Sequence, residues 1–207
     1  MTDSHTTTSY RLRLPGPTEV PARVQEAMMV PVVNHRGPEF RSMTAEIVEN
    51  LQPIFGASNP ILLFAASGTG MMEASLVNAV APGERILVLN NGQFAERFAD
   101  IARALDITVD TVDGDWGHDI DLGELETQLD RAPYRAVIAI HNESSTGGVA
   151  QLREIGALLK DRPTLLIVDS VSGLGGIEMR QDDWDVDIIF TAVHKAHMCP
   201  PDFRRSV

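Results

Sequence analysis

The sequence contains little cysteine and little lysine: its 207 residues include one cysteine, Cys199, and two lysines, Lys160 and Lys195. One cysteine cannot form an internal disulfide, so nothing indicates an oxidising compartment and we expect a cytoplasmic protein. Lysine and arginine together number 17 against 29 acidic residues, which gives a net charge of −12 with no basic run. This charge disfavours nucleic acid and anionic membranes as partners.

Long apolar stretches are also absent. The longest apolar runs, "ILLFAA" and "TLLIV", are much shorter than a membrane span, and "MTDSHTTTSYRLRL" at the N-terminus lacks the apolar region of a signal peptide. No repeat or low-complexity segment is present. The sequence therefore predicts a soluble protein with one large domain.

Short runs rich in Val, Ile and Leu recur along the chain and alternate with helical patterns such as "MMEASLVNAV", "AERFADIARAL" and "LREIGALLK". This alternation predicts an α/β fold with a mostly parallel sheet flanked by helices. Before the first run lie an extended arm and helices, the second of which should kink or break near Pro53. The predicted strands are Ile61–Ala65, Arg85–Leu89, Ile107–Val112, Arg135–Ile140, Thr164–Val168 and Val186–Phe190.

Ligands of parallel sheets bind beyond the carboxyl ends of the strands, and two of the predicted strands end in motifs suited to a flat, phosphorylated ligand. Ser67, Gly68 and Thr69 follow a strand and open a helix, whose free N–H groups form an anion cradle. A plain glycine turn is the alternative. Phe94 follows the next strand and is either a stacking platform or a core residue.

The later strands end in acidic, polar and basic groups. The strand before His141 continues into the dense polar loop "HNESSTGG", which favours a binding loop. Asp169 ends a very apolar strand, where a carboxylate needs a partner unless it caps the next turn. Lys195 lies one strand further along. A zinc site at His194, His197 and Cys199 is disfavoured, because no second ligand cluster is present.

A phosphate cradle, a stacking ring, a carboxylate and a lysine at one edge of a sheet together indicate pyridoxal 5'-phosphate. Its aldehyde needs a lysine, its pyridine nitrogen an acidic partner, its ring a flat surface and its phosphate a helix N-terminus. The order of these features along the chain is more specific than any one of them.

The chain resembles the class V aminotransferases, and within them the alanine–glyoxylate and serine–pyruvate branch. The resemblance extends from about Arg11 to Pro201 and implies the large domain of fold-type I enzymes, a homodimer and a transfer of an amino group from alanine or serine to glyoxylate or pyruvate. It rests on the motifs "LPGPTEVP", "NHRGPEF", "SGTGMMEA", "NNGQFAERF", "HNESSTGG", "VDSVSGLGGIEM" and "HKAHMCPP".

The resemblance also implies roles for individual residues. Lys195 is expected to form the Schiff base and Asp169 to contact the pyridine nitrogen. Phe94 and Val171 are expected on the two faces of the ring, and Ser144 near its hydroxyl. The phosphate is expected at Ser67, Gly68, Thr69 and His194, and a substrate pocket shared between two subunits at Asn34, His35, Arg36 and Gly37.

The sequence departs from the family pattern at two points. Val193 and His194 stand where the family has Ser-Gln, which weakens the expected phosphate contact. The chain also ends soon after the lysine, so the resemblance divides it into an arm, 1–20, and an incomplete large domain, 21–207, without the small C-terminal domain. We therefore expect little transaminase activity from these 207 residues alone.

The sequence leaves two alternatives to this function open and disfavours a third. The chain could be a remnant that folds or binds the cofactor without turnover, or another class V enzyme such as a phosphonate or ureidoglycine aminotransferase. A cysteine desulfurase is disfavoured, because Cys199 lies too close to the lysine.

Overall fold

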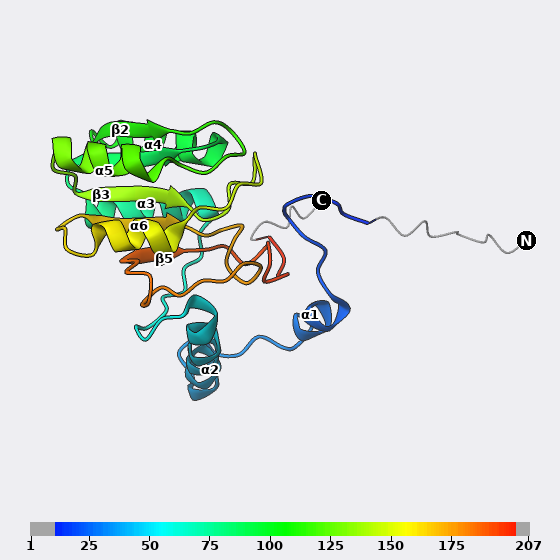
Figure 1. Ribbon diagram of the computed structural model, residues 1–207. Helices are drawn as coiled ribbons and strands as arrows, with labels where there is room; N and C mark the ends of the chain where they lie inside the picture. The colour runs from blue at the N-terminus through cyan, green and yellow to red at the C-terminus, as the bar shows by residue number, and fades with distance from the viewer. Residues whose placement is uncertain (1–10, 202–207) are drawn as a thin grey trace, which may run out of the picture.

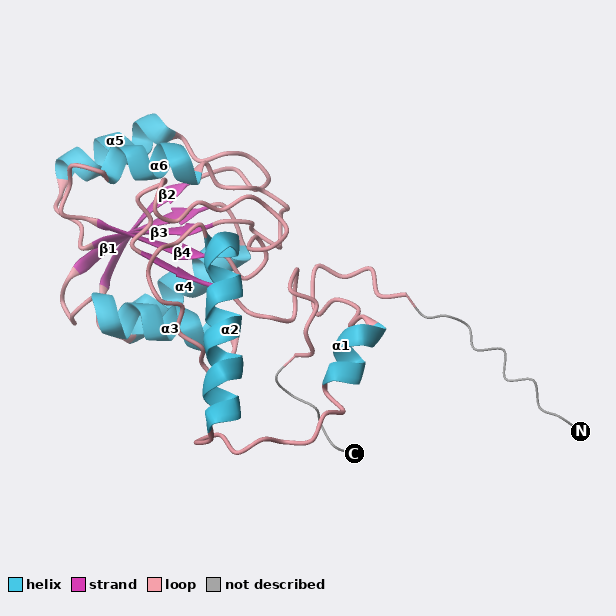
Figure 2. Ribbon diagram, turned by 90° about the horizontal axis from the view of Figure 1, so that it is seen from below, coloured by secondary structure: helices cyan, strands magenta, loops and turns pink. Residues whose placement is uncertain are grey.

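The computed structural model describes residues 11–201 and forms a five-stranded parallel sheet between two layers of helices (Figures 1 and 2). Residues 1–10 of the expected arm and 202–207 of the expected domain lie outside the described residues. The strand order is β2-β1-β3-β4-β5. The strands are β1 Arg85–Asn90, β2 Thr108–Asp113, β3 Ala136–Ile140, β4 Leu165–Asp169 and β5 Ile188–Phe190.

Two helices cover each face of the sheet, and Figure 2 shows α5 and α6 on one side and α3 and α4 on the other. The shorter α1 and the long α2 precede them, and α1 lies apart from the sheet (Figure 1). None of the helices within residues 11–201 has the length and hydropathy that crossing a membrane requires. The helices are α1 Ala22–Ala27, α2 Pro38–Phe55, α3 Gly68–Ala79, α4 Gln93–Ala104, α5 Leu122–Arg131 and α6 Leu152–Leu159.

Alternation along the strands divides the core into two. In β1, Leu87 packs with α5 and α6, whereas Val88 packs with α3 and α4. The same alternation places Leu166 of β4 in the first cluster and Ile167 in the second. Successive side chains of a strand point to opposite faces, so strands that are apolar throughout fill both cores. This confirms the predicted α/β sheet with helices on both faces.

The predicted strand Ile61–Ala65 is wrong. These residues form no strand, and two of their side chains are largely exposed, Leu62 at 72% and Phe64 at 63%. An apolar run becomes a strand only where a neighbouring strand can accept and donate its backbone hydrogen bonds, and no strand within residues 11–201 pairs with it. The other five predicted strands are confirmed to within two residues at each end.

Local signals set the helix ends. Asp121 caps α5 by accepting hydrogen bonds from the N–H groups of Gly123 and Glu124, a common role of Asp at this position. Helix α2 ends at Phe55, two residues after Pro53, and Gly56 closes it in the left-handed region with φ 61°. The helix therefore continues through Pro53 and ends at the glycine.

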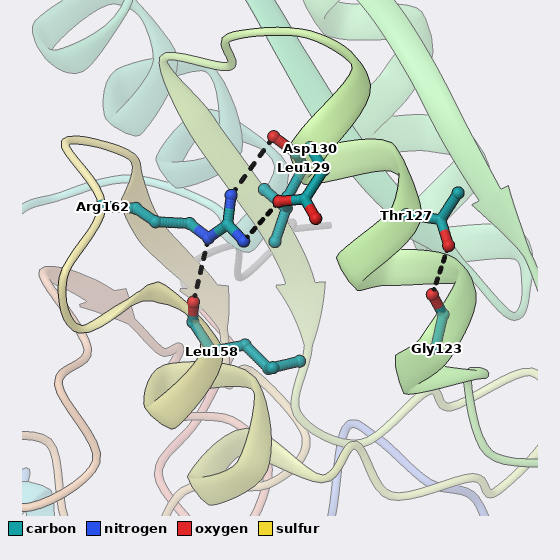
Figure 3. Close-up of polar contacts among 6 residues, drawn as sticks. All are labelled: Gly123, Thr127, Leu129, Asp130, Leu158 and Arg162. Carbon is teal, nitrogen blue, oxygen red and sulfur yellow. Dashed lines mark hydrogen bonds and ion pairs between the residues drawn. The ribbon is translucent and has the colours of Figure 1, made fainter.

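Arg162 joins the ends of two helices on the same face (Figure 3). Its guanidinium donates to the Leu129 carbonyl of α5 at 3.3 Å, to the Asp130 carboxylate at 2.7 Å and to the Leu158 carbonyl of α6 at 3.2 Å. A cation at a helix C-terminus satisfies free carbonyls and complements the helix dipole, an effect of roughly 0.3–1 kcal/mol per helix end. This contact keeps α5 and α6 side by side.

The strand register brings the loops after β3, β4 and β5 to one edge of the sheet. Ile140 pairs with Asp169, and Asp169 pairs with Phe190. The next backbone bonds continue the pattern, because the His141 N–H donates to the Asp169 carbonyl at 2.8 Å and the Ser170 N–H to the Phe190 carbonyl at 2.9 Å. The residues after each strand therefore face the same space.

Candidate active site

Lys195 is buried at the carboxyl edge of the sheet, with 9% of its surface exposed. Its Nζ donates to the Ser172 hydroxyl at 3.0 Å and to the Ser144 hydroxyl at 3.3 Å, and these two hydroxyls also bond to each other. Burial lowers the pKa of Lys195, against the opposing effect of nearby Asp169 and Glu143. A lysine with a lowered pKa is more often neutral and therefore nucleophilic.

The N-terminal arm holds the turn that carries this lysine. The Thr18 N–H donates to the His194 carbonyl at 3.1 Å, and the Thr18 hydroxyl donates to the Lys195 carbonyl at 2.7 Å. Gly16 lies against the methylene groups of the Lys195 side chain. Residues at the two ends of the chain thus build one side of the site.

Asp169 is the second buried ionisable group, with 3% exposed. Burial raises its pKa to about 7, partly offset by a hydrogen bond from the Val171 N–H at 2.8 Å; Glu143 adds to the rise and Lys195 opposes it. Ile167, two residues earlier on β4, packs with α3 and α4, so the period of a strand directs Asp169 to the same face.

Phe94 provides an aromatic surface beside the lysine. The Lys195 Nζ lies 5.9 Å from the centre of the Phe94 ring. Phe94 is the second residue of α4 and packs at the margin of the α3–α4 core, as does Val171 after β4. Phe94 thus packs against the core and also lines the site.

The start of α3 carries the predicted anion cradle. The Ser67 hydroxyl accepts a hydrogen bond from the Gly70 N–H at 3.1 Å. The N–H groups of Gly68 and Thr69 have no hydrogen-bond partner among residues 11–201. A Cβ on Gly68 would lie 3.0 Å from a methyl group of Val171, so the cradle lies next to the residue expected to cover the ring.

His141 lies behind the site at the end of β3, with 1% of its surface exposed. Its Nδ1 lies 2.7 Å from the Ser170 hydroxyl. Burial lowers its pKa to about 4, so the imidazole is neutral at physiological pH. His141 therefore links the ends of β3 and β4 without adding charge.

Other predicted residues lie outside this group. Asn34 and Gly37 form a local turn at the start of α2, with the Gly37 N–H donating to the Asn34 carbonyl at 2.8 Å, and His35 and Arg36 are exposed in the same turn. Within residues 11–201 no hydrogen bond joins this turn to Lys195 or Asp169. His194 neighbours the lysine, but its side chain makes no hydrogen bond with a described residue.

Sequence reasoning did not assign Ser172, Thr18 or His141. Ser172 follows the predicted carboxylate in "VDSVS", and Thr18 belongs to the motif "LPGPTEVP", so both were within recognisable stretches. The contacts of Thr18 and Ser172 with Lys195 could not be predicted from the sequence, because they form only when segments far apart in the chain come together. Within residues 11–201 no group of three or more His, Cys, Asp or Glu side chains could hold a metal ion.

The fold is of the α/β kind whose ligands bind at the carboxyl edge of a parallel sheet, and comparison with known proteins defines the family. The model of the family "Aminotransferase class-V" matches residues 15–202. The chain belongs to the class V aminotransferases. This confirms the family that the motifs indicated.

Individual relatives agree with this assignment. A serine–glyoxylate aminotransferase of Methylorubrum extorquens is 37% identical over 199 residues, which cover 91% of this chain and 48% of that protein. An uncharacterized aminotransferase of Methanocaldococcus jannaschii is 36% identical over 191 residues, with 92% and 50% covered. The crystal structure of alanine–glyoxylate aminotransferase from Nostoc sp. superposes with a TM-score of 0.87 at 32% identity, with 97% and 55% covered.

The chain thus spans about half the length of the curated relatives it matches. The family and its solved neighbours imply pyridoxal phosphate as the cofactor. The groups at this edge of the sheet suit that molecule. N–H groups without a partner among residues 11–201 suit a phosphate, apolar side chains a ring, a carboxyl group a ring nitrogen and an amine an aldehyde.

The raised pKa of Asp169 predicts how stability depends on pH. Between pH 4 and 7 the folded cofactor-free protein holds a proton on Asp169 that the unfolded chain releases, so the free energy of unfolding falls as pH rises. A shift from 3.8 to about 7 corresponds to at most roughly 4 kcal/mol. The Asp169→Asn variant should lose this fall and exceed the wild type in stability at pH 8.

Urea unfolding of both cofactor-free proteins from pH 4 to 8 measures this difference. Asp100→Asn, a change at an exposed carboxylate of α4, serves as the control and should follow the wild type. Parallel pH curves for Asp169→Asn and the wild type would show that the buried carboxyl group is not the cause.

Proposed function

We propose that this protein is a pyridoxal-phosphate-dependent transaminase that transfers the amino group of a small amino acid to glyoxylate or pyruvate. The observation that carries the proposal is the position of Lys195: buried, with a lowered pKa, between two hydroxyls and beside Phe94. Membership of the class V aminotransferases agrees with it.

The cofactor would be held by residues from both sides of the edge. Lys195 would bind its aldehyde carbon and Asp169 its ring nitrogen, with Phe94 and Val171 on the ring faces and Ser144 at the ring hydroxyl. Its phosphate would be held by Ser67, Gly68, Thr69 and His194. The N–H groups of Gly68 and Thr69, which have no partner among the described residues, support the phosphate position, because a helix N-terminus favours an anion.

When bound, pyridoxal phosphate supplies an electron-withdrawing ring that stabilises negative charge at the substrate Cα. Lys195, once its Nζ is free, would take the proton from that carbon and deliver it to the cofactor's C4′ carbon, acting as general base and then as general acid. The Ser172 hydroxyl accepts a hydrogen bond from Nζ and would keep it oriented. Asp169, in its ionised form, would hold a proton on the ring nitrogen, because an ion pair in a buried site favours both charges.

Glyoxylate is the better supported partner of the reaction. Four relatives and neighbours, named for serine, aspartate, alanine and ureidoglycine as amino donors, carry glyoxylate in their names, whereas an aspartate aminotransferase of Thermus thermophilus does not. The donor varies while the acceptor recurs, so we propose glyoxylate as acceptor and alanine or serine as donor. Ureidoglycine stays an alternative donor, since the neighbour from Bacillus subtilis has a TM-score of 0.87 at 28% identity.

Borohydride reduction should attach the cofactor to Lys195 and not to Lys160. Lys160 follows the end of α6 and pairs with Asp185 at 3.6 Å, with 66% of its side chain exposed, so its amine lies in solvent and away from the candidate site. Peptide mapping after reduction in the presence of pyridoxal phosphate identifies the lysine. Lys160→Arg should leave labelling unchanged, and Lys195→Arg should abolish it. Labelling at Lys160 would refute the cofactor assignment.

Transfer of an amino group should be measurable with alanine, glyoxylate and pyridoxal phosphate, which together yield pyruvate and glycine. Lys195→Ala should lower the rate roughly 10²–10⁴-fold, because positioned proton transfer contributes about that much. The measurement is the rate of pyruvate formation by the protein that contains these residues. Cofactor bound at Lys195 without any product from alanine, serine or ureidoglycine would favour a non-catalytic remnant.

We also propose that the protein forms a homodimer. Large apolar side chains are exposed around α1, α2 and the following loop, among them Met29 at 84%, Val32 at 100% and Leu62 at 72%. Exposed apolar surface of this kind marks an interaction site. Sedimentation velocity should give twice the mass of one chain. Val32→Asp should weaken the dimer about tenfold or more, equivalent to 1.4 kcal/mol, while Val77→Asp on the exposed face of α3 should not. A monomeric wild type would contradict the proposal.

A further inference from the structure

Glu143 is a buried carboxylate that none of the roles above uses. None of its surface is exposed, and no lysine or arginine within residues 11–201 pairs with it. Its Oε2 accepts hydrogen bonds from the N–H groups of Phe94 at 3.0 Å and Ala95 at 3.3 Å, and its Oε1 accepts from the N–H at 3.0 Å and the hydroxyl at 2.7 Å of Ser145. Four donors directed at two oxygens suit the acceptor-only ionised carboxylate.

These bonds make Glu143 the cap of helix α4, although it lies 49 residues from Phe94 in the sequence. The N-cap residue of α4, Gly92, has no side chain to cap it, and a Cβ there would collide with the Glu143 side chain. Ser145 completes the cap by accepting from the Gln93 N–H at 3.0 Å. A carboxylate at a helix N-terminus is stabilised by the helix dipole, so the loop after β3 is fixed to the start of α4.

The two segments that Glu143 joins both reach Lys195. Phe94 on α4 brings its ring to 5.9 Å from the lysine Nζ, and Ser144 in the loop accepts a hydrogen bond from the same nitrogen. Phe94 donates directly to Glu143, and Ser144 is its neighbour in the chain. The spacing between the ring and the hydroxyl is therefore set by the Glu143 carboxylate.

We propose that Glu143 is a positioning residue of the cofactor site, which holds the Phe94 ring and the Ser144 hydroxyl near the Lys195 amine and places a fixed negative charge in the same site. The cofactor part of this inference rests on the function proposed above. Its electrostatic part concerns Lys195 and Asp169 in the cofactor-free protein.

The charge of Glu143 acts on both ionisable groups of the site. It raises the pKa of Asp169 and counteracts the burial that lowers the pKa of Lys195. The other charges acting on these two groups are their own, Lys195 on Asp169 and Asp169 on Lys195. Removing the charge of Glu143 should therefore lower both pKa values.

Glu143 also distinguishes two helix N-termini at the same edge. The first N–H groups of α4 are occupied, Gln93 by Ser145 and both Phe94 and Ala95 by Glu143. At α3 the N–H groups of Gly68 and Thr69 are free of partners among residues 11–201. With its own anion in place, α4 does not compete for a phosphate, so a bound phosphate is directed to α3.

The test compares Glu143→Gln, Glu143→Asp and the control Asp121→Asn. Asp121 caps α5 with the same kind of bonds but takes no part in the site. NMR titration of Asp169 and Lys195 in the cofactor-free proteins should show both pKa values lowered in Glu143→Gln and unchanged in Asp121→Asn. Glu143→Asp keeps the charge on a shorter side chain, so both values should stay near those of the wild type.

Equilibrium dialysis of pyridoxal phosphate measures the geometric part. Both Glu143 variants should bind it about tenfold more weakly, equivalent to 1.4 kcal/mol, because Phe94 and Ser144 lose their spacing, while Asp121→Asn should bind it as the wild type does. All three variants should melt at lower temperature: Glu143→Gln and Asp121→Asn lose a negative charge at a helix N-terminus, and Glu143→Asp is too short to keep every bond of its cap. If Glu143→Gln does not fold, Ser145→Ala weakens the same cap and should lower cofactor affinity to a smaller extent.

Two outcomes separate this inference from the proposed function. Glu143→Gln with wild-type pKa values and wild-type cofactor affinity, and only a lower melting temperature, would make Glu143 a helix cap and overturn the inference. A wild type that does not bind pyridoxal phosphate would overturn the proposed function, and the NMR titration would still decide whether Glu143 sets the charge state of Asp169 and Lys195.

Discussion

The parallel pairing of β3, β4 and β5 is the constraint on which the rest of the site depends. Because Ile140, Asp169 and Phe190 stand side by side, the three loops that follow leave the sheet at the same level. A slip of one residue would turn the Asp169 side chain to the opposite face, away from α3 and α4. The apolar residues within the strands thus fix the site more than the loops that compose it, because both helical layers pack on that register.

The same packing makes the site costly for the cofactor-free protein. Burial raises the pKa of Asp169 and lowers that of Lys195, so each group is pushed toward its neutral form. The hydrogen bonds from Val171 and to Ser172 offset only part of this effect. Natural proteins accept such local conflicts at functional sites and recover the stability in well-packed cores. In this protein the two apolar clusters, one on each face of the sheet, supply that stability.

Sequence reasoning predicted the parts of the structure that depend on local pattern. Apolar runs with helical patterns between them predicted five of the strands correctly. Ile61–Ala65 had the same composition as a strand but no partner, and hydrogen-bond pairing is not written in a single segment. The contacts of Glu143 with Phe94 and of Thr18 with Lys195 join residues 49 and 177 positions apart, so no local pattern could predict them.

The two lysines show how position, and not residue type, determines chemistry. Lys160 follows α6, pairs with Asp185 and leaves most of its side chain in water, so it is an ordinary surface residue. Lys195 lies in a turn whose backbone accepts a hydrogen bond from Thr18. Its amine donates hydrogen bonds to Ser144 and Ser172. Its amine is desolvated yet hydrogen-bonded, which permits a nucleophile without leaving a buried charge unpaired. Each of these three contacts comes from a different segment, so the lysine acquires its character only when the arm, the β3 loop and the β4 loop have assembled.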